Sequence, residues 1–287
     1  MIRAALAGTI LAEALVGAML LVQRAPLEFR NITYSTTNGV PSLLDVYQQP
    51  DTSSAAPVLV YFHGGAWTDG DRPKAASSFR EFLSLGFSVV SVDYRLAGVA
   101  RAPAAVQDAR CAMAWVKANA IKYHFDTNRI VAYGTSAGGQ LALMTAMLPP
   151  HSDIDLPPCT DVPPIAAVLD YYGPADVTNL AAKSSRIRAW LGDSIPFAEM
   201  GKRMSPKSYV RAGLPPVFIV HGDADPTVPY AQSVALEAAL RRNGVAVDLY
   251  TVPQGVHGKF PDEQKKIVMT RIEAFLAGLH ITSRPAR

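Results

Sequence analysis

The chain has 287 residues, of which 49% are hydrophobic and 18% are charged. This length and balance are typical of one large globular domain, with or without an insertion, and not of a disordered or fibrous chain. The formal net charge is +3 and the lysines and arginines form no block, which argues against a nucleic-acid-binding protein.

The N-terminal segment, residues 1–30, contains an apolar run at residues 4–22 that follows Arg3. A basic start before an apolar core is typical of a secretory signal peptide. The run is also nearly as long as a membrane span of about 20 residues, although Glu13 is costly in hydrocarbon. The pattern favours export or membrane anchoring, with membrane contact through residues 4–22. A helix packed on the protein is the main alternative.

The next part of the chain alternates between strand and helix patterns. The unbroken apolar run at 58–62 is typical of a strand buried on both faces of a sheet. Strands are predicted at 31–35, 43–47, 58–62, 87–92 and 129–135, helices at 75–85, 103–123 and 140–148, and a turn at 126–128.

The second half continues this alternation after a proline-rich loop at 149–164 and a strand at 165–172. Residues 175–214 are the least regular part, and we expect them to form a partial cap of short helices, one of them at 185–191. Strands at 216–220 and 245–252 and helices at 229–243 and 261–279 complete the pattern.

Strands that alternate with helices predict an α/β fold with a mainly parallel sheet of about eight strands and helices on both faces. The first two strands form a hairpin-like pair, which indicates an antiparallel edge. Residues 31–287 are therefore expected to form one domain that carries the partial cap.

Cys111 and Cys159 are the only cysteines, too few for a disulfide scaffold or a CxxC metal site. Cys111 lies in a helical pattern and Cys159 in the proline-rich loop. The two can pair if the chain is exported, or remain two small unpaired apolar side chains.

One segment links a strand pattern to a helix pattern through Gly134-Thr135-Ser136-Ala137-Gly138. This matches G-x-S-x-G, the nucleophile elbow, in which a sharp turn exposes a serine hydroxyl at the end of a sheet. Glycine is needed at both ends because a side chain there would collide with the neighbouring backbone. Ser136 is the predicted nucleophile.

A serine hydroxyl needs a base within hydrogen-bond reach, and the base needs a third group that holds its tautomer. His257 follows the last predicted strand and lies between glycines, so it is the best candidate base. We expect solvent exposure for three other histidines, His124, His151 and His280. Asp223 and Asp225 both follow the strand at 216–220, and position alone does not choose between them. The order serine, acid, histidine is that of the α/β-hydrolases.

Attack on an ester also requires N–H donors for the oxyanion. Gly64 and Gly65 follow the buried strand at 58–62, and Ala137 follows the nucleophile, so these three amides are the predicted oxyanion hole. The alternative for Gly64 and Gly65 is a simple tight turn. This chemistry needs neither a metal nor an organic cofactor.

Motifs from separate parts of the chain together resemble one family. They are H-G-G-A-W at 63–67, D-Y-R-L at 93–96, G-T-S-A-G-G at 134–139, H-G-D-A-D-P-T-V-P at 221–229 and G-V-H-G at 255–258. The set resembles α/β-hydrolase carboxylesterases of the hormone-sensitive-lipase-like and feruloyl/acetylxylan-esterase-like groups. The resemblance implies that Asp225 is the acid, and places the oxyanion hole on Gly64, Gly65 and Ala137.

Two departures from the lipase-like pattern are visible. Ala66 stands where many lipase-like members have a third glycine, and Leu96 is followed by Ala97-Gly98-Val99 in place of A-P-E. The pair Ala66-Trp67 is nearer to the xylan-ester and kynurenine-formamidase types. Trp67 is a candidate pocket residue, or simply packs. Arg95 is expected to tie loops together.

These features predict a serine carboxylesterase that acts on small-molecule esters through Ser136, His257 and Asp225. The absence of a long, regular cap favours short acyl chains. An aryl-formamidase, a peptidase or an acyltransferase would use the same site. A non-catalytic binding module on this fold is a further alternative, but such modules usually lose a triad member.

Overall fold

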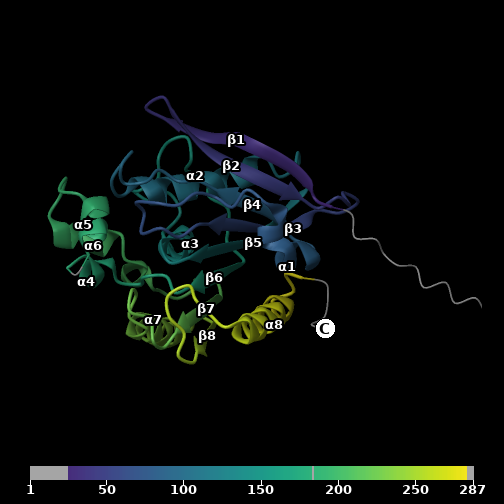
Figure 1. Cartoon of the computed structure of the whole chain (residues 1–287). Helices are drawn as coiled ribbons and strands as arrows, with labels where there is room; N and C mark the ends of the chain where they lie inside the picture. The colour runs from purple at the N-terminus through teal and green to yellow at the C-terminus, as the bar shows by residue number, and fades with distance from the viewer. Residues whose placement is uncertain (1–24, 183, 283–287) are drawn as a thin grey trace, which may run out of the picture.

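The computed structural model describes residues 25–182 and 184–282 (Figure 1). The predictions made for the apolar run at 4–22 therefore lie outside the described residues. Within the described ranges, no helix has the length and apolar character that a membrane crossing requires.

A single eight-stranded sheet forms the centre of the molecule, in the order β1-β2-β4-β3-β5-β6-β7-β8. Strands β1, β2 and β4 pair antiparallel, and all other neighbours pair parallel. This confirms the mainly parallel sheet with an antiparallel edge. The strands are β1 (Leu27–Thr37), β2 (Val40–Gln48), β3 (Ala56–Phe62), β4 (Ser88–Val92), β5 (Phe125–Thr135), β6 (Ala167–Tyr171), β7 (Val217–Gly222) and β8 (Val247–Val252).

The helices occupy both faces of the sheet, as the alternation predicts. They are η1 (Ala76–Phe79), α1 (Arg80–Ser84), α2 (Ala104–Ala118), α3 (Ala137–Met147), α4 (Val177–Ala181), α5 (Ser185–Leu191), α6 (Phe197–Arg203), η2 (Pro206–Tyr209), α7 (Ala231–Arg242) and α8 (Asp262–Gly278). Short helices α4, α5 and α6 and the turn η2 occupy the segment 175–214, which we call the cap segment. Helix α5 has the bounds predicted for it.

Alternation along the strands separates two hydrophobic layers. In β3, Val58, Val60 and Phe62 face one layer, whereas Leu59 faces the other, and all four side chains are fully buried. Helices α2, α3 and α7 cover the first layer, and α1 and α8 cover the second (Figure 1). A strand buried on both faces is expected to read as an unbroken apolar run, as β3 does.

Two local predictions were wrong in their boundaries. Helix α2 ends at Ala118, earlier than predicted, where the Asn119 side chain and backbone both donate to the Trp115 carbonyl. The turn expected at 126–128 lies inside β5, at a register shift between that strand and β3. Asp126 still accepts the Asn128 N–H at 2.9 Å, which is turn chemistry within an irregular strand.

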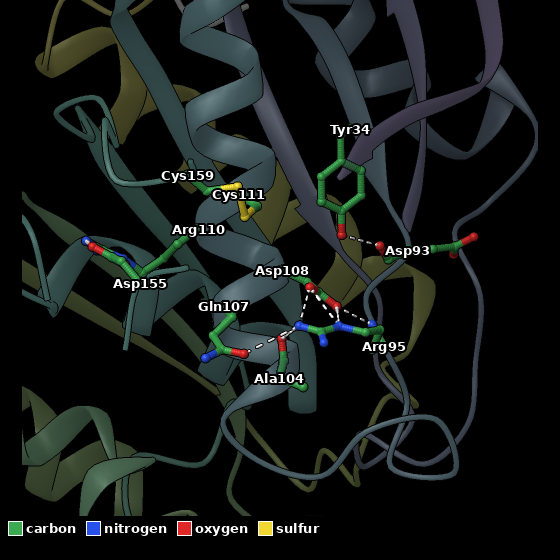
Figure 2. Close-up of a disulfide and its surroundings, with 10 residues drawn as sticks. All are labelled: Tyr34, Asp93, Arg95, Ala104, Gln107, Asp108, Arg110, Cys111, Asp155 and Cys159. Carbon is green, nitrogen blue, oxygen red and sulfur yellow. Dashed lines mark hydrogen bonds and ion pairs between the residues drawn. A yellow bond between two sulfur atoms is a disulfide. The ribbon is translucent and has the colours of Figure 1, made fainter. Parts of the chain in front are cut away.

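The proline-rich loop is fastened to α2 by a disulfide and an ion pair (Figure 2). Cys111 and Cys159 form a disulfide with a Cα–Cα distance of 4.7 Å, so of the two alternatives left open for them, pairing is the observed one. Next to it, Arg110 binds Asp155, and both side chains are at most 2% exposed. Buried charges of this kind are held only when they are paired and hydrogen-bonded.

The loop after β4 is held by Arg95, as the sequence predicts. The Arg95 guanidinium bonds the Asp108 carboxylate of α2 at 2.8 Å, and the Asp108 side chain is fully buried. The Tyr34 hydroxyl of β1 donates to the Asp93 carbonyl at 2.7 Å. These contacts join the antiparallel edge, the loop after β4 and helix α2 (Figure 2).

Removal of the disulfide should lower the stability of the protein. The crosslink joins positions with a sequence separation of 48, and closing a loop of that size in the unfolded chain is expected to contribute about 2–4 kcal/mol. Urea unfolding of the Cys111→Ala/Cys159→Ala variant should show a correspondingly lower free energy of unfolding. Reduced wild type, which keeps both sulfur atoms, should fall to nearly the same value. Equal stability of the oxidised and reduced proteins would contradict this prediction.

Asp170 in β6 should make stability depend on pH. The side chain is fully buried, with Oδ1 accepting the Gly173 N–H at 2.9 Å and Oδ2 without a hydrogen bond among the described residues. Burial raises the pKa of the carboxyl to about 8 from an ordinary 3.8. Because the folded-state pKa is raised, the stabilising contribution is complete below the unfolded value and is lost as the pH rises through the folded value.

The test compares urea unfolding of wild type and Asp170→Asn across this pH range. Asparagine keeps the acceptor and does not ionise. The stability of wild type relative to the variant should therefore fall by up to about 1.4 kcal/mol per pH unit between the two pKa values. A difference between the two proteins that is independent of pH would show that Asp170 is already ionised when buried.

Candidate active site

The turn between β5 and α3 brings three backbone segments into close contact. A Cβ atom at Gly134 would lie 2.1 Å from the Gly138 oxygen, and one at Gly138 would lie 2.0 Å from the Phe62 oxygen. Only glycine fits at either position, as the sequence predicts. Between them Ser136 adopts φ 55° and ψ −119°, and its N–H donates to the Tyr171 carbonyl at 2.8 Å. A non-glycine residue held at positive φ is strained and often lies at a functional site.

The loop after β8 places His257 between the predicted nucleophile and the predicted acid. His257 Nε2 lies 2.8 Å from Ser136 Oγ, and His257 Nδ1 lies 2.6 Å from Asp225 Oδ2. The loop can approach because a Cβ atom at Gly222 would lie only 2.1 Å from the Gly255 oxygen. The structure therefore brings the three predicted side chains into one chain of hydrogen bonds.

Four donors face the carboxylate of Asp225. Oδ1 accepts the N–H groups of Thr227 at 2.7 Å and Val228 at 2.9 Å. Oδ2 lies 2.6 Å from His257 Nδ1 and 3.3 Å from His221 Nε2. Burial alone would raise the pKa of Asp225, but the bonds from His221, His257 and the two amides outweigh burial and hold this pKa well below its ordinary value. The carboxyl is therefore ionised when folded, as a partner for an imidazolium must be.

Asp223 is the other acidic residue that follows the strand predicted at 216–220, and it makes different contacts. It is exposed, and its Oδ1 accepts the Gln254 N–H at 2.6 Å. It thus ties two loops together, while Asp225 faces His257. The loop histidines expected to be solvent-exposed are indeed exposed: His124, His151 and His280.

The Gly64-Gly65 segment runs beside the nucleophile. A Cβ atom at Gly64 would lie 3.5 Å from the Ser136 Cβ, and Gly65 has φ 128° and accepts the Asp69 N–H at 3.0 Å. The segment is thus both a tight turn and a neighbour of Ser136. The N–H groups of Gly64, Gly65 and Ala137 have no acceptor among the described residues. Unpaired amides beside a helix N-terminus favour negative charge.

Trp67 packs inside the protein. It is 1% exposed, so its ring does not line an open pocket. Its Nε1 donates to Gln140 Oε1 at 3.0 Å, and the ring stacks on Trp190 of α5 with centroids 3.9 Å apart. Gln140 in turn donates to the Met204 carbonyl at 2.7 Å. This buried contact joins the Gly64-Gly65 loop, helix α3 and the cap segment.

Sequence reasoning assigned no role to three residues that support the site: Tyr172, Gln140 and His221. The Tyr172 ring lies 4.7 Å from that of His257, and Tyr172 directly follows β6. The rule that site residues follow strands points to this position. Gln140 has no such indication, because a polar residue inside a helix usually faces solvent. Within the described ranges, no three metal-binding side chains gather in a way that would hold an ion.

The sequence is similar to those of known esterases. The BD-FAE family model matches residues 44–240. Esterase LipQ of Mycobacterium tuberculosis is 35% identical over 77% of this chain and 55% of its own length. Carboxylesterase NlhH of the same species is 30% identical over 83% of this chain and 76% of its own. The chain spans about half the length of the first curated relatives it matches.

Solved structures give the same result. The apo form of Thermogutta terrifontis esterase 2 superposes with a TM-score of 0.77 at 26% identity, covering 92% of this chain and 98% of that one. The fold is therefore that of the α/β-hydrolases. Because the family model covers more than half of the sequence and the carboxylesterase relatives cover more than two thirds of it, the chain belongs to the BD-FAE family of α/β-hydrolase esterases.

Proposed function

We propose that this protein is a serine carboxylesterase that cleaves small-molecule esters. The observation that carries the proposal is the continuous bond path from Ser136 Oγ through His257 to Asp225, with contacts of 2.8 and 2.6 Å. Such a path activates a hydroxyl whose own pKa makes it a poor nucleophile. The relatives named as esterases support the same reaction class.

In the proposed reaction, His257 Nε2 takes the proton from Ser136 Oγ as the oxygen attacks the ester carbonyl. The resulting oxyanion lies among the Gly64, Gly65 and Ala137 amides, each worth about 3–4 kcal/mol when aimed at the developing charge. His257 then protonates the leaving alcohol, which departs and leaves an acyl-serine. A water molecule activated by the same imidazole releases the acid. Throughout, Asp225 orients His257 and balances its charge.

We also propose a preference for short acyl chains. The cap segment consists of short helices, α4, α5 and α6 and the turn η2, none longer than seven residues. One solved structure of Thermogutta terrifontis esterase 2 is described as propionate-bound, and another as phosphorylated by paraoxon. A three-carbon acid in a relative of 26% identity supports a small acyl site here. Rates on p-nitrophenyl esters should fall as the acyl chain lengthens beyond propionyl or butyryl.

Replacing the nucleophile should abolish hydrolysis without unfolding the protein. We expect Ser136→Ala to lower kcat for p-nitrophenyl acetate by about 10⁴-fold or more, because the acyl-enzyme can no longer form. Paraoxon should add one phosphoryl group to wild type, seen by intact-protein mass spectrometry, and none to the variant. Matching thermal unfolding curves serve as the control. Residual turnover near the wild-type level would remove Ser136 from the mechanism.

Two aspartates in one loop provide a matched pair for the acid. Asp225→Asn should lower kcat by about 10³–10⁴-fold, because an amide cannot hold the same His257 tautomer or balance its charge. Asp223→Asn should stay close to wild type, since among the described residues the Asp223 carboxylate accepts only the Gln254 N–H. Both are measured as kcat and KM on the same ester. A larger loss in Asp223→Asn would transfer the acid role to that residue.

The same assay separates esters from other acyl compounds that this site could accept. Purified protein is assayed separately with p-nitrophenyl acetate, an N-formyl aryl amide and a chromogenic peptide at equal concentrations. The proposal expects kcat/KM to be highest for the ester. A higher value for the formamide or the peptide would overturn the ester assignment while leaving Ser136 as the nucleophile.

A further inference from the structure

His221, at the end of β7, belongs to the site but has no part in the mechanism described above. It is fully buried, and both ring nitrogens have partners. Nε2 lies 2.9 Å from the Val228 carbonyl oxygen and 3.3 Å from Asp225 Oδ2. Nδ1 lies 2.6 Å from Ser233 Oγ on α7, and Ser233 is 1% exposed.

These contacts determine where the hydrogen of the neutral ring lies. A carbonyl and a carboxylate oxygen are both acceptors, so Nε2 must carry the hydrogen that they share. Nδ1 is then a lone-pair acceptor, and the Ser233 hydroxyl donates to it. Because both residues are buried, water does not compete for these positions, and the tautomer is set by the protein.

The shared hydrogen faces the oxygen of Asp225 that also faces His257. Oδ1 is fully occupied by two backbone amides at 2.7 and 2.9 Å. Oδ2 therefore divides its charge between two imidazole N–H groups, one from His257 at 2.6 Å and one from His221 at 3.3 Å. Each additional donor on a carboxylate stabilises its ionised form and weakens its action on the other partners.

We propose that His221 is a positioning residue for the reaction: its Nε2–H holds the Asp225 carboxylate in register with His257 and limits how strongly Oδ2 stabilises the His257 imidazolium. Ser233 fixes the tautomer that this role requires. The inference rests on the proposed esterase function and adds a fourth side chain to the path of three. It acts through Asp225 and does not touch the substrate.

Two further titratable side chains, both phenols, pack against the two imidazoles. The Tyr172 ring lies 4.7 Å from the His257 ring and 6.4 Å from the His221 ring. Burial raises the pKa of Tyr172 above its ordinary value, so it stays neutral in an esterase assay. Tyr230 lies 5.7 Å from His221, and its hydroxyl is bonded to Thr251. Both phenols therefore contribute packing around the imidazoles, with no charge from Tyr172.

The first experiment compares two replacements of His221. It measures the pH dependence of kcat/KM, whose acidic limb reports the pKa of the catalytic base in the free enzyme. His221→Met fills similar volume without a donor. It should lower kcat by about tenfold or more while KM changes little, and should move the acidic limb to higher pH by about 0.5 unit. His221→Gln places an amide N–H near the position of Nε2 and should restore most of both properties. Titration with paraoxon corrects every rate for the fraction of active enzyme.

The exposed His280, at the end of α8, gives the matched control, and His280→Gln should leave rate and limb unchanged. A residue that only filled space would lower the amount of active enzyme without moving the limb. Two results would overturn the proposal. One is an acidic limb of kcat/KM that does not shift in His221→Met after correction for active enzyme. The other is an equal shift in the Met and Gln variants. Absence of ester hydrolysis in wild type would instead refute the proposed function itself.

A second measurement leaves His221 in place, so it can be made even if the Met variant does not fold. ¹⁵N NMR of histidine-labelled protein distinguishes a protonated ring nitrogen from a lone-pair nitrogen. His221 should show the hydrogen on Nε2 and a lone pair on Nδ1 at neutral pH. Ser233→Ala should shift the Nδ1 resonance. A hydrogen found on Nδ1, with Nε2 bare, would overturn the proposal independently of any activity.

Discussion

The close approach of helix α3 to strands β3 and β5 is the constraint on which the rest of the site depends. Gly134 and Gly138 leave no room for a side chain at either end of the turn, and Ser136 between them is held at φ 55°. This geometry brings the hydroxyl to the end of the sheet, within 2.8 Å of His257 Nε2. The strain is tolerated because β3 and β5 are paired parallel strands whose central residues, 58–60 and 130–132, are fully buried and closely packed.

Charge is balanced around that hydroxyl by loops that follow β7 and β8. The backbones at Gly222 and Gly255 touch, which brings Asp225 and His257 together although they leave different strands. Burial would favour a neutral Asp225, yet four donors keep it ionised. A buried carboxylate with fewer donors behaves differently: Asp170, one strand away, has a single bond and a pKa raised to about 8. The two acids differ in both respects, because Asp170 is buried more deeply and has fewer donors than Asp225, and both differences favour its neutral form.

The loop that carries Gly64 and Gly65 is held from the cap side. Trp67 stacks on Trp190, and its ring nitrogen is joined through Gln140 to the backbone at Met204. The elbow helix, this loop and the cap segment therefore share one buried contact. A movement of the cap segment would therefore shift the loop that carries the amides beside Ser136, because buried polar contacts are costly to break without a replacement partner.

The amino-acid sequence alone was enough to predict the α/β alternation, the antiparallel edge, the elbow and the chain order of the serine, acid and histidine candidates, because local periodicity, turn residues or spacing specify each of them. It also placed α5 and the buried strand β3 correctly. The folded structure adds what depends on the direction in which a side chain faces. Position alone left Asp223 and Asp225 open, and the family motif pointed to Asp225. The structure turns Asp225 toward His257 and Asp223 toward the Gln254 N–H. The pairing of Cys111 with Cys159, the burial of Trp67 and the second imidazole at Asp225 all require segments far apart in the chain to meet, and no local pattern records such distances.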